Sequence, residues 1–147
     1  MYKREDRGQL IRVINVVCSE SKWMISNKFI LTPEWECALQ ISNCNDYLIL
    51  VVEDENILVG WCRIFLLFNS FSIKIGELGI GLLPKYRGQY IGAKMIEQSL
   101  SWSKNKDFIQ VHLSVHQENY SAQQLFRKFK FKTYDCHGEN NLMSLAL

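Results

Sequence analysis

The fold is decided by the stretch Leu82-Leu83-Pro84-Lys85-Tyr86-Arg87-Gly88-Gln89-Tyr90-Ile91-Gly92-Ala93. This stretch follows a β-rich run over residues 71–83 and opens an apolar stripe with helical spacing. A turn that contains glycine and leads into a helix exposes unpaired N–H groups at the positive end of the helix dipole. That geometry suits a phosphate or pyrophosphate, although a plain strand-to-helix turn explains the same glycines.

Two common phosphate-binding motifs are absent from this stretch. The dinucleotide fingerprint G-x-G-x-x-G does not occur, and no Gly-Lys-Ser/Thr sequence follows the glycines. The sequence therefore predicts an anion site of another kind.

The elements on either side alternate between helical and strand patterns. Apolar residues at spacings of three and four predict a helix over 6–19, and Thr32-Pro33-Glu34 is a helix start signal. A first hairpin is predicted over residues 47–53 and 57–68, and a closing hairpin over residues 131–136 and 142–147. Between them, a strand with two different faces is predicted over residues 109–115. Another helix is predicted by the spacing of Ala122, Leu125, Phe126 and Phe129.

Three glycines, Gly76, Gly79 and Gly81, interrupt the predicted strand over 71–83. Glycine weakens the interior of a strand, so these positions indicate a bulge or a close approach by another backbone or a ligand.

Length and composition favour one packed domain over residues 1–147. The chain has 48% hydrophobic and 22% charged residues and a net charge of +2, which gives no general reason to expect nucleic acid or an anionic membrane as partner. The five cysteines form no C-x-x-C pair and indicate reduced thiols in the cytoplasm rather than a disulfide framework or metal site. Neither a signal peptide nor a membrane-spanning run is expected.

The order of these motifs resembles the GNAT superfamily of acetyl-CoA-dependent N-acetyltransferases over about residues 47–135. The resemblance depends on an acid-bearing strand at Glu77-Leu78-Gly79-Ile80, the Arg-Gly-x-x-x-Gly turn, Leu113-Ser114-Val115, Asn119, and Leu125-Phe126. It implies a mixed α/β fold with a mostly antiparallel central sheet, flanking helices, and two parallel strands that splay apart. The strands that splay would be those over 71–83 and 109–115.

The resemblance also implies where acetyl-CoA, the co-substrate, would bind without a metal. Its pantetheine arm would lie between the splayed strands, held with the acetyl carbonyl by backbone groups near Leu82 and Leu83. Asn119 and Phe126 occupy further cofactor-binding positions of the family. The pyrophosphate would lie on the turn formed by Arg87, Gly88, Gln89, Tyr90, Ile91, Gly92 and Ala93.

The reaction so implied is direct attack of an amine on the thioester in a ternary complex. An amine with a pKa near 10 needs a proton acceptor at neutral pH, and Glu77 is the catalytic candidate, acting directly or through water. The alternative interpretation of Glu77 is a residue at the edge of a strand that points toward solvent. His112 and Ser114 share one face of the neighbouring strand and are secondary candidates for holding water or substrate.

Several residues depart from the family pattern. Phe126 stands where tyrosine is usual and cannot donate a proton to the leaving sulfur, a role open to Tyr120, Tyr134 or water. Tyr90 and Lys130 stand where glycine is usual. Helical periodicity begins within ten residues of Met1, so the family's first strand is missing or vestigial, and the uncovered sheet edge favours a homodimer.

The sequence also bears on alternative functions and on the acceptor. The main alternative function is a CoA-binding module without transferase activity. Nucleic-acid binding by the basic and aromatic residues of 127–132 is disfavoured, because helical spacing directs Phe126 and Phe129 to the core. The resemblance implies a primary amine of a small molecule, peptide or protein as the acceptor. Its predicted pocket involves Trp23, Met24, Phe29 and residues 68–71.

Overall fold

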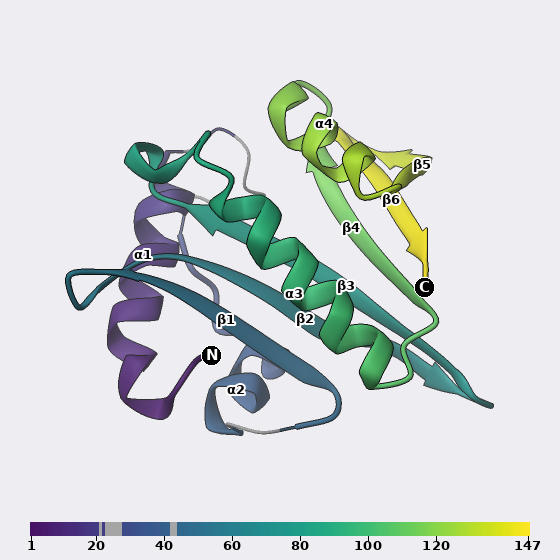
Figure 1. The fold of residues 1–147 in the computed structure, drawn as a ribbon, viewed down its shortest axis with the longest axis horizontal. Helices are drawn as coiled ribbons and strands as arrows, with labels where there is room; N and C mark the ends of the chain where they lie inside the picture. Colours follow the sequence, from purple (N-terminus) through teal and green to yellow (C-terminus); the bar gives the residue numbers. More distant parts are fainter. Residues whose placement is uncertain (21, 23–27, 42–43) are drawn as a thin grey trace.

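The computed structural model describes residues 1–20, 22, 28–41 and 44–147 (Figure 1). Six strands form one sheet in the order β1-β2-β3-β4-β6-β5, in which β3 and β4 are parallel and the other neighbours antiparallel. The strands are β1 (Tyr47–Asp54), β2 (Ile57–Ser70), β3 (Ile73–Leu82), β4 (Gln110–His116), β5 (Lys132–His137) and β6 (Asn140–Ala146). The helices are η1 (Arg4–Asp6), α1 (Arg7–Ser19), α2 (Pro33–Gln40), η2 (Pro84–Tyr86), α3 (Ile91–Asn105) and α4 (Tyr120–Lys128).

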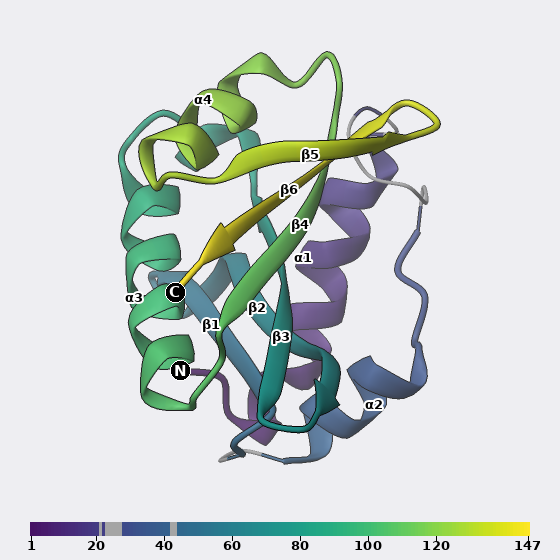
Figure 2. The same ribbon diagram turned by 90° about the vertical axis from the view of Figure 1, so that its right-hand side faces the viewer.

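Helices cover the sheet on both sides. In Figure 2, α3 and α4 lie on one side of the strands and α1 and α2 on the other. The side chains of β2 alternate accordingly: Cys62 and Ile64 belong to a core with α3, whereas Trp61 and Phe65 belong to a core with α1 and α2. We refer to these two sides as the α3/α4 face and the α1/α2 face.

Parallel pairing between β3 and β4 is short. It comprises the pairs Ile75–Gln110, Gly76–Val111 and Glu77–His112, after which the rest of β3 has no partner on β4. Figure 1 shows the two strands diverging beyond this point, which we call the β3–β4 split. The splayed pair expected from the family resemblance is thus confirmed.

The three strand glycines lie in different surroundings. Gly76 pairs with Leu66, where the register with β2 shifts, as expected for a bulge. A Cβ at Gly79 would lie 2.8 Å from Nε of Arg63, and one at Gly81 would overlap the ring of Trp61. Both neighbours are side chains of β2 that lie across β3, and neither is a backbone group. Bulky side chains on the adjacent strand therefore fill the space beside these two glycines, and a close approach by a ligand stays a prediction.

The edge of the sheet at β1 is partly covered by the N-terminal residues. The N–H of Tyr2 donates to the carbonyl of Ile49 at 3.0 Å, and Tyr2 is buried. Residues 1–20, which the structure describes in full, contain no strand before α1. The expectation of a missing or vestigial first strand is therefore confirmed for these residues.

Candidate functional site

The end of β3 directs backbone groups toward the β3–β4 split. The N–H of Leu83 donates to Val59 of β2 at 2.9 Å. Because alternate residues of an antiparallel strand bond to opposite sides, the N–H of Leu82 points away from β2, toward the side where β4 no longer pairs. The contact of Leu82 with a cofactor between the strands stays a prediction, as does that of Leu83.

The turn into α3 leaves the helix N-terminus open. Gly88 and Tyr90 both have left-handed backbones, with φ of +73° and +66°, and Tyr90 is the N-cap residue without a side-chain capping bond. No acidic residue lies in the first turn. The N–H groups of Ile91, Gly92 and Ala93 precede the first intrahelical bond, from Lys94 to Tyr90, and so have no acceptor within the helix. An anion is the natural ligand for such groups.

The side chains of this turn bond within the protein. Nε of Arg87 donates to the carbonyl of Leu82 at 2.9 Å, and its two terminal nitrogens bind the carboxylate of Glu20 at 3.1 and 2.7 Å. Gln89 donates to the carbonyl of Lys85 at 2.9 Å. The Arg87 guanidinium therefore ties the end of α1 to the end of β3, and what the turn offers an anion is its backbone.

Glu77 lies on the α1/α2 face, because its neighbour Leu78 belongs to the opposite core. One carboxylate oxygen accepts from Arg63 at 2.9 Å, and the Glu77 side chain is 42% exposed. The guanidinium of Arg63 also lies 4.4 Å from the ring centroid of Phe65. Glu77 is therefore neither a buried lone carboxylate nor a freely solvated one, but the exposed half of an ion pair that sequence reasoning missed.

His112 lies directly across from Glu77 on β4 and makes two hydrogen bonds. Nδ1 lies 3.1 Å from the hydroxyl of Tyr134, and Nε2 lies 2.9 Å from Oε1 of Gln110. Burial lowers the pKa of His112 from its ordinary value, and the charge of Glu77 opposes that shift. The period-two pattern of β4 predicted which face His112 occupies, but nothing local in the sequence indicated Tyr134 as its partner.

Asn119 and Phe126 belong to α4 and its start. The side chain of Asn119 caps the helix by accepting from the N–H of Ala122 at 3.3 Å, which is the local role expected of a residue at helix entry. Phe126 is buried and packs edge-on against Phe131, with the ring centroids 5.9 Å apart. The cofactor contacts expected of these two residues remain predictions.

The residues expected to form the acceptor pocket lie only partly within the described structure. Trp23 and Met24 lie outside the described residues, whereas Phe29 packs edge-on against Trp35 at 5.3 Å. Residues 68–71 form the tip of the β2–β3 hairpin, where Phe71 is 97% exposed. This tip adjoins the start of β3, the opposite end of the strand from Leu82, and its part in an acceptor pocket stays a prediction.

None of the five cysteines, all of which the structure describes, forms a disulfide. Cys62 is fully buried beside Ser99, and burial raises the pKa of its thiol to about 12. It is therefore held in the unreactive thiol form.

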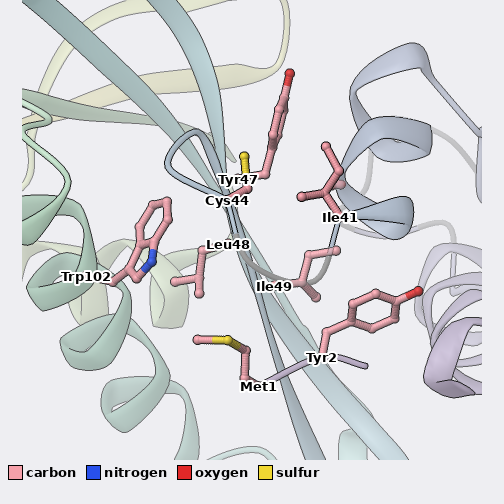
Figure 3. Close-up of a pocket in the computed structure, with 9 residues that line it drawn as sticks. Met1, Tyr2, Ile41, Cys44, Tyr47, Leu48, Ile49 and Trp102 are labelled. Carbon is pink, nitrogen blue, oxygen red and sulfur yellow. The ribbon is translucent and has the colours of Figure 1, made fainter. Parts of the chain in front are cut away.

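Two hollows lie away from the β3–β4 split. Figure 3 shows one between edge strand β1, the end of α2 and Trp102 of α3, lined by Met1, Tyr2, Ile41 and Ile49 among others. The second lies between α3 and the end of β6. Among the residues that the structure describes, no group of three metal-ligating side chains gathers, and no helix is long and apolar enough to cross a membrane.

Comparison with known families now decides the classification. A model of the acetyltransferase (GNAT) family matches residues 12–131, which include the strand pair, the turn and α3. The chain belongs to the GNAT family. The resemblance based on the Arg-Gly-x-x-x-Gly turn is thus confirmed.

Relatives of this GNAT chain include a Bacillus subtilis (strain 168) protein described as a candidate ribosomal protein bS18-alanine N-acetyltransferase. The two are 32% identical over 80 residues, which cover 54% of this chain and 50% of that protein. This GNAT chain therefore matches about half the length of that curated relative.

Solved structures agree with the fold. A GNAT-family acetyltransferase from Streptococcus pneumoniae superposes with a TM-score of 0.84 at 19% identity, covering 99% of this chain and 96% of that one. A Salmonella typhimurium protein solved with acetyl-CoA superposes with a TM-score of 0.82 at 13% identity, covering 99% of this chain and 91% of that one. Arabidopsis thaliana Naa50, in complex with the bisubstrate analogue CoA-Ac-MVNAL, gives 0.76 at 17% identity, covering 99% and 95%. At these identities the likeness establishes the fold.

Proposed function

We propose that the protein is an acetyl-CoA-dependent N-acetyltransferase that moves an acetyl group to a primary amine by direct attack on the thioester. The observation that carries this proposal is the juxtaposition, in a GNAT chain, of the β3–β4 split with the uncapped N-terminus of α3. The split offers backbone donors along one side of β3, and the helix start offers donors for a pyrophosphate.

In this proposal the pantetheine arm lies in the split, against the backbone of Leu82 and Leu83, and the pyrophosphate lies on residues 87–93. An N–H that points into the split can stabilise the oxyanion formed when the amine attacks the thioester carbon. The backbone of β3 supplies such donors without rearrangement, because its conformation is held by pairing with β2. Asn119 and Phe126 complete the proposed cofactor side.

The CoA thiolate leaves without a tyrosine donor in this scheme. Phe126 has no hydroxyl, and Tyr134, the alternative named above, has its hydroxyl engaged by His112 on the α1/α2 face. A thiol has an ordinary pKa of about 8.5, so its thiolate is an adequate leaving group near neutral pH. Loss of the usual tyrosine is therefore compatible with acetyl transfer.

The acceptor is proposed to reach the thioester from the α1/α2 face, where Glu77 contributes negative charge and is the sequence-based candidate for proton acceptor. The named activity of the Bacillus subtilis relative and the peptide portion of the Naa50 ligand support a peptide amine over a small molecule. We further propose that residues 1–147 act as one domain in the cytoplasm, with no nucleic acid, membrane or metal involved. Two copies would associate at the part of the β1 edge that the N-terminal residues leave uncovered.

The proposal is tested by titrating the protein with acetyl-CoA in a calorimeter and then measuring thiol release with a panel of amines. The panel contains a peptide with N-terminal alanine, the peptide Met-Val-Asn-Ala-Leu, a lysine side-chain amine and spermidine. We expect saturable binding and release with at least one peptide. Tight binding without release for every amine would instead identify a CoA-binding module.

A further inference from the structure

Three side chains form a hydrogen-bonded chain on the α1/α2 face. The hydroxyl of Tyr134 on β5 lies 3.1 Å from Nδ1 of His112, and Nε2 of His112 lies 2.9 Å from Oε1 of Gln110. Tyr134 is 53% exposed, while His112 and Gln110 are partly buried. The chain therefore runs from the protein surface to a half-buried imidazole.

The direction of the hydrogen bonds follows from the acceptor at one end. The amide oxygen of Gln110 has no hydrogen to give, so Nε2 of His112 is the donor in that bond. A neutral imidazole then has its lone pair on Nδ1, and the Tyr134 hydroxyl donates to it. This is the arrangement of a base already connected to an exposed hydroxyl.

The position of His112 is the apex of the β3–β4 split. The pair Glu77–His112 is the last one before the strands part, so the imidazole lies beside the first unpaired stretch of β3. It also faces the side from which the acceptor is proposed to enter, since Val111 and Leu113 belong to the opposite core. No other histidine of this chain lies at the split: His116 is at the far end of β4 and His137 is at the end of β5.

We propose that His112 is the catalytic base of acetyl transfer and that Tyr134 conducts the proton to it. This assignment rests on the proposed function and replaces Glu77 as the terminal proton acceptor. Glu77 instead acts as a positioning residue whose negative charge, on the adjacent strand, stabilises the imidazolium.

The proton that the amine loses ends on His112. The nitrogen of the neutral amine bonds to the thioester carbon, and its surplus proton passes to the Tyr134 oxygen while the Tyr134 proton passes to Nδ1 of His112. The tetrahedral intermediate then collapses, the carbon–sulfur bond breaks, and the thiolate departs. The imidazolium keeps its Nε2–H bond to Gln110 and returns the proton to solvent or to the thiolate.

The choice between the two candidate bases depends on what surrounds them. An oxygen of Glu77 is bound by the Arg63 guanidinium at 2.9 Å, so that oxygen already has a partner within the protein. Around His112, β3 contributes Glu77, which binds Arg63 of β2, and β4 itself contributes Gln110. On the other side, β6 contributes the neutral Ser144 opposite His112, and β5 contributes Tyr134 and the cationic Lys132, which pairs with Ser144. A neutral imidazole is also the side chain whose ordinary pKa, about 6.5, is best matched to base catalysis near neutral pH.

The kinetic test uses the full chain, acetyl-CoA and the fastest amine of the panel. We expect His112→Gln to lower kcat about 100-fold or more and to remove the acidic limb of the pH profile, and Tyr134→Phe to lower kcat about tenfold or more. The affinity for acetyl-CoA should stay within about threefold in both variants. His116→Gln is the matched control on the same strand, and we expect it to keep wild-type kinetics.

A second measurement does not depend on turnover. In ¹⁵N spectra of the histidine rings, wild-type His112 should carry its hydrogen on Nε2, and Tyr134→Phe should shift the Nδ1 resonance. A hydrogen on Nδ1 would overturn the relay.

The two proposals fail in different ways. If His112→Gln leaves both kcat and the acidic limb unchanged in an active enzyme while Glu77→Gln removes the limb, the base is Glu77 and this inference is wrong. If wild-type protein releases no thiol with any amine, the proposed function fails, and the inference fails with it.

Discussion

Gly92 offers the sharpest test of where the cofactor lies. It is the second residue of α3, and a Cβ built there would lie 3.4 Å from Cδ2 of Leu125 on α4 and 3.8 Å from Cδ1 of Ile80 on β3. Both are ordinary contact distances, so the folded protein can accept the methyl group of Gly92→Ala. That methyl group nevertheless points into the space between α3, β3 and α4, through which the proposed path of acetyl-CoA runs.

The expected magnitudes separate stability from binding. Replacing glycine by alanine at a helical position that accommodates it stabilises a protein by about 0.4–1 kcal/mol, because the unfolded chain loses freedom. We therefore expect Gly92→Ala to raise the free energy of unfolding slightly. Its affinity for acetyl-CoA should fall at least tenfold, which corresponds to about 1.4 kcal/mol, because the pyrophosphate can no longer approach the N–H groups at the helix start.

Gly8→Ala is the matched control, since Gly8 is the second residue of α1 and a Cβ there meets nothing within 4 Å. Urea unfolding and calorimetric titration with acetyl-CoA measure the two effects. Both variants should gain stability, and only Gly92→Ala should lose affinity. Equal acetyl-CoA affinity in the two variants would refute the placement of the pyrophosphate on this turn.

Three further predictions concern the site and its support. Tyr90 is 82% exposed and has a φ of +66°. Replacing it by glycine should relieve about 1–2 kcal/mol of backbone strain and cost about 0.5–1 kcal/mol through the greater freedom of glycine in the unfolded chain. We therefore expect Tyr90→Gly to raise the midpoint of urea unfolding, and a lower midpoint would contradict this. In the same assay, Gly81→Ala should lower the free energy of unfolding by about 1–3 kcal/mol, because the added Cβ would overlap the buried ring of Trp61. A variant as stable as the wild type would show that the ring moves aside freely. The lowered pKa of His112 means that the unfolded chain binds more protons, so this residue's contribution to stability is complete above about pH 6.5 and is lost as pH falls through the folded pKa. Urea midpoints between pH 7 and 5 should therefore fall less steeply for His112→Gln than for wild type, and parallel slopes would exclude this coupling.

Much of the fold could be predicted because its signals are local. Thr32 caps α2 by accepting from the N–H of Trp35, three residues away, and Pro33 follows as the first helical residue. The hairpin of β1 and β2 and the helix at 91–105 likewise follow from turn residues and apolar spacing within one element. The family assignment came from the order of such local motifs.

The partners at the site could not be predicted, since they are distant in the sequence. Arg63 and Glu77 are 14 residues apart, His112 and Tyr134 are 22 apart, and Glu20 and Arg87 are 67 apart. Each pair forms because sheet register or helix packing brings two elements together, and a period-two pattern specifies a face of a strand but not its neighbour.

The sequence by itself therefore determined the elements, the glycine turn, the face of each strand and membership of the GNAT family. The tertiary structure decided the rest: that β3 and β4 part after Glu77 and His112, that β2 side chains explain two strand glycines, that Arg87 binds Glu20, and that Tyr134 reaches His112 across β6. The physical reason is that backbone conformation and periodicity are encoded over a few residues, whereas the charge and hydrogen bonding of a side chain depend on which distant strand lies beside it.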